Sequence, residues 1–137
     1  METTDYLAPY IRFQGKCREA MAFYLEAFGG DLSMTSFEEA GVIEAPHPEY
    51  IMHAQLITPE GMTFMGTDGA GEPVSYGTSI SLAIVTEDHD RGHILFDALS
   101  EGGEIDVELE KQMWGAEFGA VVDKFGVNWM FNISPNE

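Results

Sequence analysis

The sequence predicts an α+β fold made of two copies of one unit, in which a strand, a helix and three more strands follow each other. A glycine pair at 29–30 ends the first predicted helix and is followed by a strand and a Pro-Glu-Gly turn at 59–61. Seventy-three positions after residue 29, a pair at 102–103 ends another helix, before a strand and an Asp-Lys-Phe-Gly turn at 123–126. Because one unit cannot bury its sheet alone, we expect the two βαβββ units to form an open, curved mixed sheet around a ligand-binding cleft.

The first half contains signals for each of its elements in order. A strand is predicted at 6–13, and Gln14 and Gly15 turn the chain into a helix at 17–28. The apolar residues of this helix recur at 3.6-residue spacing and form one stripe of Cys17, Ala20, Met21, Tyr24 and Phe28. Strands follow at 31–38, 50–58 and 62–67, and the segment 40–49, with one glycine and two prolines, is expected to be a loop bordering a site.

The second half repeats this order after a linker at about 69–76, so the modules cover about 1–68 and 77–137 of a single domain. The first strand is predicted at 78–85, and its helix-facing residues are expected to be Ile80, Leu82 and Ile84. A helix follows at 88–99, whose N-cap candidates are Thr86, Asp88 and Asp90. Its buried stripe is expected to contain Ile94, Leu95, Ala98 and Leu99. Further strands are predicted at 104–110, 117–123 and 128–134.

The composition indicates a globular chain in a reducing compartment. With 137 residues, 45% of them hydrophobic, the chain is long enough to bury a core. Residues 1–5 are polar and acidic, so we expect no signal peptide, and no apolar run approaches the ~20 residues of a membrane helix. Cys17 is the only cysteine, which leaves no intrachain disulfide and favours the cytoplasm.

The charge balance is strongly acidic, with 24 acidic against 6 basic residues and a net charge of −18. Such a surface repels nucleic acid and anionic membranes, so neither is an expected partner. It would attract a cationic ligand, although the plainer interpretation is a well-solvated acidic surface.

Several motifs together resemble one family over nearly the whole chain. The first half contains PYIRFQGKCREA at 9–20, FY at 23–24 and FGG at 28–30, and the second contains WG at 114–115, FG at 118–119, DKFGV at 123–127 and WM at 129–130. These motifs resemble the PhnB-like branch of the vicinal oxygen chelate superfamily, which includes glyoxalase I, bleomycin-resistance proteins and extradiol dioxygenases. The resemblance implies paired βαβββ modules around a cleft, usually in a homodimer. The branch sometimes carries a demethylubiquinone methyltransferase label, but the sequence lacks a glycine-rich nucleotide-binding loop after its first strand.

The resemblance also implies a divalent metal (nickel, zinc, manganese or iron) held by one ligand from each of four strands. The matching positions fall near Pro9, at His53, near Ser79 and near Met130, and only His53 is a competent ligand. We therefore expect no cofactor and no standard metal site. The alternative is a metal-dependent lyase, isomerase or dioxygenase that uses His53.

A cleft without metal can still bind a small organic molecule. On the strand 50–58, packing of Met52, Ala54 and Leu56 against the helix would turn His53 and Gln55 toward the cleft. The remaining residues expected to line the cleft are Phe13, Met65, Ser79, Ser81, Trp114 and Met130. His53 is also the candidate acid–base residue, and its alternative is a structural role with a hydrogen bond across the sheet.

The other reactive side chains favour structural interpretations. Cys17 begins the first helix but lies in its apolar stripe, as a buried residue would. Arg12 could pair with an acid between the modules or meet an anionic substrate. His89 and His93 are spaced i, i+4 with Asp90 and Asp97 nearby, so they could hold a metal on the helix surface, although a solvated helix face is the simpler interpretation.

Three functions follow from these observations. The leading one is a cytoplasmic homodimer that binds a small, cationic or aromatic molecule without turnover. The second is the metal-dependent enzyme built on His53. The third is a regulatory or accessory dimer that acts through its surface rather than through the cleft.

Overall fold

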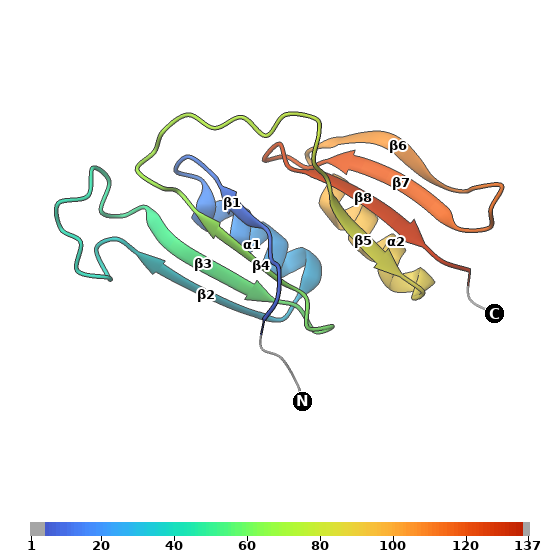
Figure 1. Cartoon of the computed structure of the whole chain (residues 1–137), viewed down its shortest axis with the longest axis horizontal. Helices are drawn as coiled ribbons and strands as arrows, with labels where there is room; N and C mark the ends of the chain where they lie inside the picture. The colour runs from blue at the N-terminus through green and yellow to red at the C-terminus, as the bar shows by residue number, and fades with distance from the viewer. Residues whose placement is uncertain (1–4, 136–137) are drawn as a thin grey trace. The chain divides into compact units, whose positions relative to one another are not determined.

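The computed structural model describes residues 5–135 and divides into two compact units, with the boundary in the chain between Val74 and Ser75 (Figure 1). The first unit contains β1 (Tyr10–Arg12), α1 (Cys17–Phe28), β2 (Asp31–Ser36), β3 (Ile51–Ile57) and β4 (Thr63–Thr67). The second contains β5 (Leu82–Thr86), α2 (His89–Ser100), β6 (Glu104–Lys111), β7 (Glu117–Val122) and β8 (Asn128–Ile133). The α+β fold class of two βαβββ units, predicted from the repeat, is confirmed.

The strands have the same order in both sheets, β1-β4-β3-β2 in the first unit and β5-β8-β7-β6 in the second. In each sheet the first strand of the unit is parallel to the last, and the other neighbouring strands are antiparallel. α1 packs on β2, β3 and β4, and α2 packs on β5 to β8. Each helix therefore covers one face of its own sheet and leaves the other face uncovered by that helix (Figure 1). Within residues 5–135, neither helix is long and apolar enough to cross a membrane.

The first helix has the predicted bounds and the predicted buried stripe. All five predicted stripe residues are buried, and Ala27 is buried with them. The helix ends at Gly29, whose φ of 74° lies in the region that favours glycine and whose N–H donates to the carbonyl of Leu25. The strand before it is shorter than predicted, because only residues 10–12 pair with β4.

The second helix differs from its prediction in the residues that it buries. Its buried residues are Gly92, Leu95, Phe96 and Leu99, whereas Ile94 is 57% exposed. Gly92 lets the helix lie directly on β8, because a Cβ there would be 2.4 Å from Cδ1 of Ile133. That close approach turns Phe96 onto the sheet and Ile94 toward solvent. Of the three N-cap candidates, Asp88 caps the helix by accepting a 3.0 Å hydrogen bond from the N–H of Arg91.

The strand that precedes α2 begins later than predicted, at Leu82 rather than at residue 78. The ladder with β8 starts at the pair Leu82 and Trp129, and the segment before it bends. The prediction that Ile80 faces the helix is therefore wrong, since Ile80 lies outside the strand and is 73% exposed. Ile84 does lie on the buried side, with 6% exposure.

The second glycine of each pair explains why the sequence repeats the motif. A Cβ on Gly30 would lie 2.1 Å from the carbonyl oxygen of Ile57, and a Cβ on Gly103 would lie 2.2 Å from that of Val122. In both units the chain leaves the helix and passes directly against the backbone of a neighbouring strand, where only glycine fits.

A buried carboxylate organises the first unit. Asp68, 1% exposed, accepts 2.8 Å hydrogen bonds from the N–H groups of Gly15 and Cys17 through Oδ1, and a 2.9 Å bond from that of Ile51 through Oδ2. The residue before α1, Lys16, makes no side-chain cap. Asp68 therefore supplies the N-terminal cap of α1 from 51 positions away and joins it to the start of β3.

Burial, together with the same carboxylate, makes Cys17 a poor nucleophile. Burial, followed by the negative charge of Asp68, raises the pKa of the Cys17 thiol from 9.0 to about 12. Since the thiolate is the reactive form, the fully buried thiol is a packing residue, as its place in the apolar stripe indicates.

We expect Gly30→Ala to lower the free energy of unfolding by roughly 1–3 kcal/mol more than Gly41→Ala does, because the added methyl group collides with the backbone oxygen of Ile57, which cannot rotate away. Gly41→Ala is the matched control, since Gly41 also has a positive φ (83°, against 103° for Gly30) but no atom within 4 Å of an added Cβ. In urea unfolding the control itself should lose about 1–2 kcal/mol, the strain of alanine in the left-handed region. Equal losses in both variants would contradict the close approach.

We expect Asp68→Asn to cost roughly 1–3 kcal/mol, because an amide NH₂ must replace one of two oxygens that both accept hydrogen bonds from backbone N–H groups. Thermal and urea unfolding would measure the loss. The exposed Asp97→Asn serves as the control and should stay within about 0.5 kcal/mol of the wild type. A wild-type stability for Asp68→Asn would show that the carboxylate does not hold the unit together.

Cys17 should make stability depend on alkaline pH. The folded thiol keeps its proton up to about pH 12, whereas the unfolded thiol loses its proton near pH 9.0, so the unfolded state binds fewer protons between these values and stability falls as pH rises. Relative to Cys17→Ala, which shares every other titrating group, the wild type should lose about 1.4 kcal/mol per pH unit above pH 9. Urea titrations under reducing conditions would test this. A difference that is constant with pH would mean that the folded thiol titrates normally.

Candidate functional site

The face of the first sheet that α1 leaves uncovered carries the polar residues of β3. Ala54 and Leu56 are fully buried beneath α1, so the alternating residues His53 and Gln55 lie on the opposite face. A Cβ on Gly66 would touch Cys17 and Met21 of α1, which places the neighbouring Met65 on that opposite face as well.

The strand register brings these residues together. Gln55 lies opposite Met65 in the ladder of β3 and β4, and Met65 lies opposite Tyr10 in the ladder of β4 and β1. The hydroxyl of Tyr10 is 3.5 Å from Nδ1 of His53, and the two rings are nearly perpendicular with centroids 5.8 Å apart. This face thus holds an imidazole, an amide, a phenol and a thioether within three neighbouring strands. Tyr10 is the kind of partner across the sheet that a structural histidine is expected to have. The imidazole of His53 remains partly exposed beside it.

The other predicted cleft residues lie elsewhere. Phe13 is 3% exposed and packs near Tyr24 and Gly66 on the α1 side of the sheet, in the core of the first unit. Four belong to the second unit: Ser79, Ser81, Trp114 and Met130. The two serines are exposed and precede β5, and Trp114, 66% exposed, lies in the turn between β6 and β7. Met130 lies on β8 opposite Ala83 and Ala120, on the face away from α2.

Arg12 has an acidic neighbour within its own unit. An added Cβ at Gly69 would be 3.2 Å from both Nε of Arg12 and Oε1 of Glu72, so the two side chains lie near each other. Hydrogen bonds from the backbone N–H groups of Glu72 and Ala70, and then the charge of Arg12, hold the pKa of the Glu72 carboxyl below its usual value. This supports the structural interpretation of Arg12.

Of the four positions that the family resemblance relates to metal ligands, near Pro9, at His53, near Ser79 and near Met130, only His53 carries a metal-binding side chain. The backbone carbonyl of Pro9 accepts a hydrogen bond from Met65, and Ser79 and Met130 offer a hydroxyl and a thioether. Among residues 5–135, three side chains suited to a metal converge instead in the second unit: His89, His93 and Glu117.

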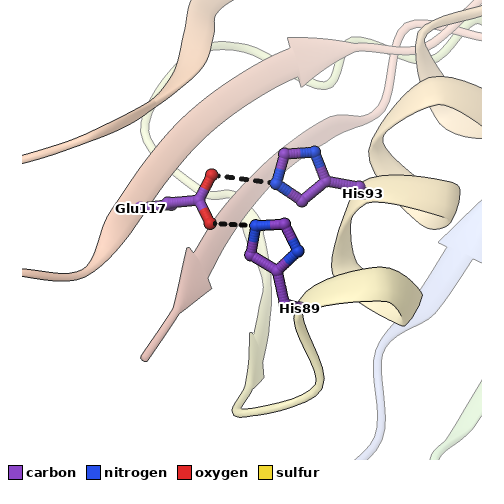
Figure 2. A group of neighbouring side chains, drawn as sticks. All are labelled: His89, His93 and Glu117. Atoms are coloured by element: carbon purple, nitrogen blue, oxygen red, sulfur yellow. Dashed lines mark hydrogen bonds and ion pairs between the residues drawn. The ribbon is translucent and has the colours of Figure 1, made fainter. Parts of the chain in front are cut away.

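This group joins α2 to the first residue of β7. Figure 2 shows both imidazoles turned toward one carboxylate, with Nε2 of His89 2.8 Å from Oε2 and Nε2 of His93 2.8 Å from Oε1 of Glu117. The two rings are 4.2 Å apart between centroids. The Glu117 side chain is 18% exposed, while those of His93 and His89 are 38% and 57% exposed.

Spacing in the sequence pointed to the two histidines but not to their carboxylate. Asp90, which the sequence placed nearby, is 96% exposed and lies 3.7 Å from Nδ1 of His89, on the side away from Glu117. Glu117 is 24 positions from His93, and it reaches the helix because it pairs with Ile133, on which Gly92 packs. The H-x-x-x-H spacing was the available signal, and the strand register supplied the third residue.

Comparisons with known proteins place this chain in a family. The family model described as 3-demethylubiquinone-9 3-methyltransferase matches residues 5–132. Protein YjdN of Escherichia coli (strain K12) is 26% identical over 138 residues, covering 93% of this chain and 94% of YjdN. The structure of PA1353 from Pseudomonas aeruginosa is similar with a TM-score of 0.83 and 32% identity, covering 97% of this chain and all of that one.

The PhnB protein from Bacillus cereus is similar with a TM-score of 0.75 and 27% identity, covering 95% of this chain and all of that one. A glyoxalase-related enzyme from Fulvimarina pelagi shares the fold with a TM-score of 0.60 at 16% identity, over 96% of this chain and 89% of that one. With a family model that matches nearly all of its length, this chain belongs to the PhnB-like family, described as 3-demethylubiquinone-9 3-methyltransferase.

Proposed function

We propose that this protein binds a small organic molecule on the uncovered face of its first sheet, without the standard metal of the superfamily. The observation that carries the proposal is the group formed by His53, Gln55, Met65 and Tyr10 on that face. It combines hydrogen-bonding groups with aromatic and thioether surface, as small-molecule sites do. A net charge of −18 favours a cationic ligand, which can also be aromatic, over an anionic one.

The methyltransferase description of the family finds no support in the junction between β1 and α1. A nucleotide-type cofactor fold binds its ligand with free N–H groups at this junction in a parallel sheet. Here the N–H groups of Gly15 and Cys17 donate to Asp68, and the sheet is mixed. The alternative of a metal-dependent lyase, isomerase or dioxygenase rests on His53, with no further metal-binding side chain at Pro9, Ser79 or Met130.

The proposal keeps two expectations from the sequence. The family resemblance favours a homodimer, and the single cysteine favours a cytoplasmic location. Size-exclusion chromatography with light scattering would measure the oligomeric state.

Thioflavin T, a cationic aromatic dye that fluoresces when its rotation is restricted, is a suitable probe of this face. We expect it to bind more tightly than the anionic dye anilinonaphthalene sulfonate, and more weakly as salt rises, because the attraction is screened. His53→Ala and Gln55→Ala should each weaken binding roughly three- to tenfold, the loss of about one hydrogen bond or contact. Fluorescence titration measures both effects.

His47→Ala is the matched control, because it removes an imidazole from the same unit, where His47 stacks on Tyr50 at 4.2 Å. It should bind the dye like the wild type. If His53→Ala and Gln55→Ala also bind like the wild type, this face of the sheet is not the binding site.

A further inference from the structure

We infer that His89, His93 and Glu117 form a binding site for one divalent transition-metal ion, with zinc as the natural probe. The site lies wholly within the second unit and shares no residue with the proposed organic-ligand face or with the four superfamily ligand positions.

The first argument is the ligand set. Two imidazole nitrogens and one carboxylate are a recurrent set for zinc, and they leave the fourth tetrahedral position to water or another ligand. Imidazole also suits nickel and copper. The i, i+4 spacing of two histidines on a helix places both rings on one face, an arrangement by which helices hold zinc.

The second argument is the distance between the ligand atoms. All three lie within 4.8 Å of one another, and each Nε2 is 2.8 Å from a carboxylate oxygen. At zinc–ligand distances of about 2.0–2.1 Å, tetrahedral ligand atoms lie about 3.3 Å apart. An ion therefore needs each histidine to separate from the carboxylate oxygen by about 0.5 Å, and ligand atoms up to 4.8 Å apart to approach by at most about 1.5 Å. Because both Nε2 atoms point at the carboxylate, either protons or one metal ion can bridge them (Figure 2).

The third argument is that Glu117 is held in place. Its side chain is 18% exposed, at the start of a strand paired with β8, while Gly92 fixes α2 against Ile133 of β8. The carboxylate is therefore positioned before an ion arrives, which lowers the cost of ordering the site.

Groups of both signs surround the site. The N-terminal end of α2 carries a partial positive charge, and Lys111 lies opposite Glu117 in the ladder with β6, so both oppose a cation. Asp88 and Asp90 oppose these effects at the same end of the helix, and the whole chain is strongly acidic. General attraction of cations to this acidic surface is the alternative that the experiment must separate from a defined site.

The test is a calorimetric titration of the whole protein with zinc chloride in a non-coordinating buffer. We expect saturation at one ion per chain, and at least a tenfold loss of affinity in His93→Ala and in Glu117→Gln, because removing a direct ligand costs at least as much as removing its outer partner. Two variants serve as controls: His53→Ala removes an imidazole at the superfamily position, and Glu104→Gln neutralises an exposed acid on β6. Both should bind zinc like the wild type.

Circular dichroism confirms that the variants fold, and alanine is a better helix former than histidine, so His93→Ala does not weaken α2 through its intrinsic propensity. Ring ¹⁵N NMR gives an independent measurement, in which zinc should shift the Nε2 signals of His89 and His93 but not those of His47 and His53. The inference is overturned if zinc does not saturate, if His93→Ala and Glu117→Gln bind as the wild type does, or if His53→Ala alone loses the ion.

Discussion

The carboxylate of Asp68 is the interaction on which the arrangement of the first unit depends. Its oxygens bind the N–H groups of the turn before α1, of the first residue of α1 and of the first residue of β3. These hydrogen bonds join the start of the helix to the start of a strand of the sheet, and a buried carboxylate is stabilising only when its oxygens are hydrogen-bonded in this way. The negative charge of Asp68 also adds to the effect of burial, which is the main reason that the Cys17 thiol stays protonated.

Covering one sheet face with a helix decides where a site can form. In the first unit, α1 packs on the small and apolar residues of β3, so His53 and Gln55 lie with Tyr10 on the face that α1 does not cover. In the second unit, Met130 lies on the corresponding face, while Glu117 lies on the helix side at the first residue of the interior strand β7. Polar chemistry therefore occurs on different faces in the two units, although their strand order is the same.

His53 and the pair of His89 and His93 lie in different settings. His53, at the position that the family resemblance relates to a metal ligand, has a tyrosine as its aromatic neighbour rather than a second metal-binding side chain. His89 and His93 share a carboxylate because tertiary contacts bring α2 to the start of β7. The organic-ligand face and the metal site that we propose therefore use different residues of the chain.

The sequence alone determined the repeated unit and the bounds of α1, and it limited the cap of α2 to three neighbouring candidates, because glycine pairs, apolar spacing and capping side chains act over a few residues. It also predicted the alternation that sets His53 and Gln55 apart from Ala54. Only the tertiary structure decided the cap of α1, the exposure of Ile94 and the partner of the two helix histidines. These depend on the contacts of Asp68 with Cys17, of Ile133 with Gly92 and of Glu117 with His93, which join residues 24 to 51 positions apart, and no local pattern encodes how such segments pack.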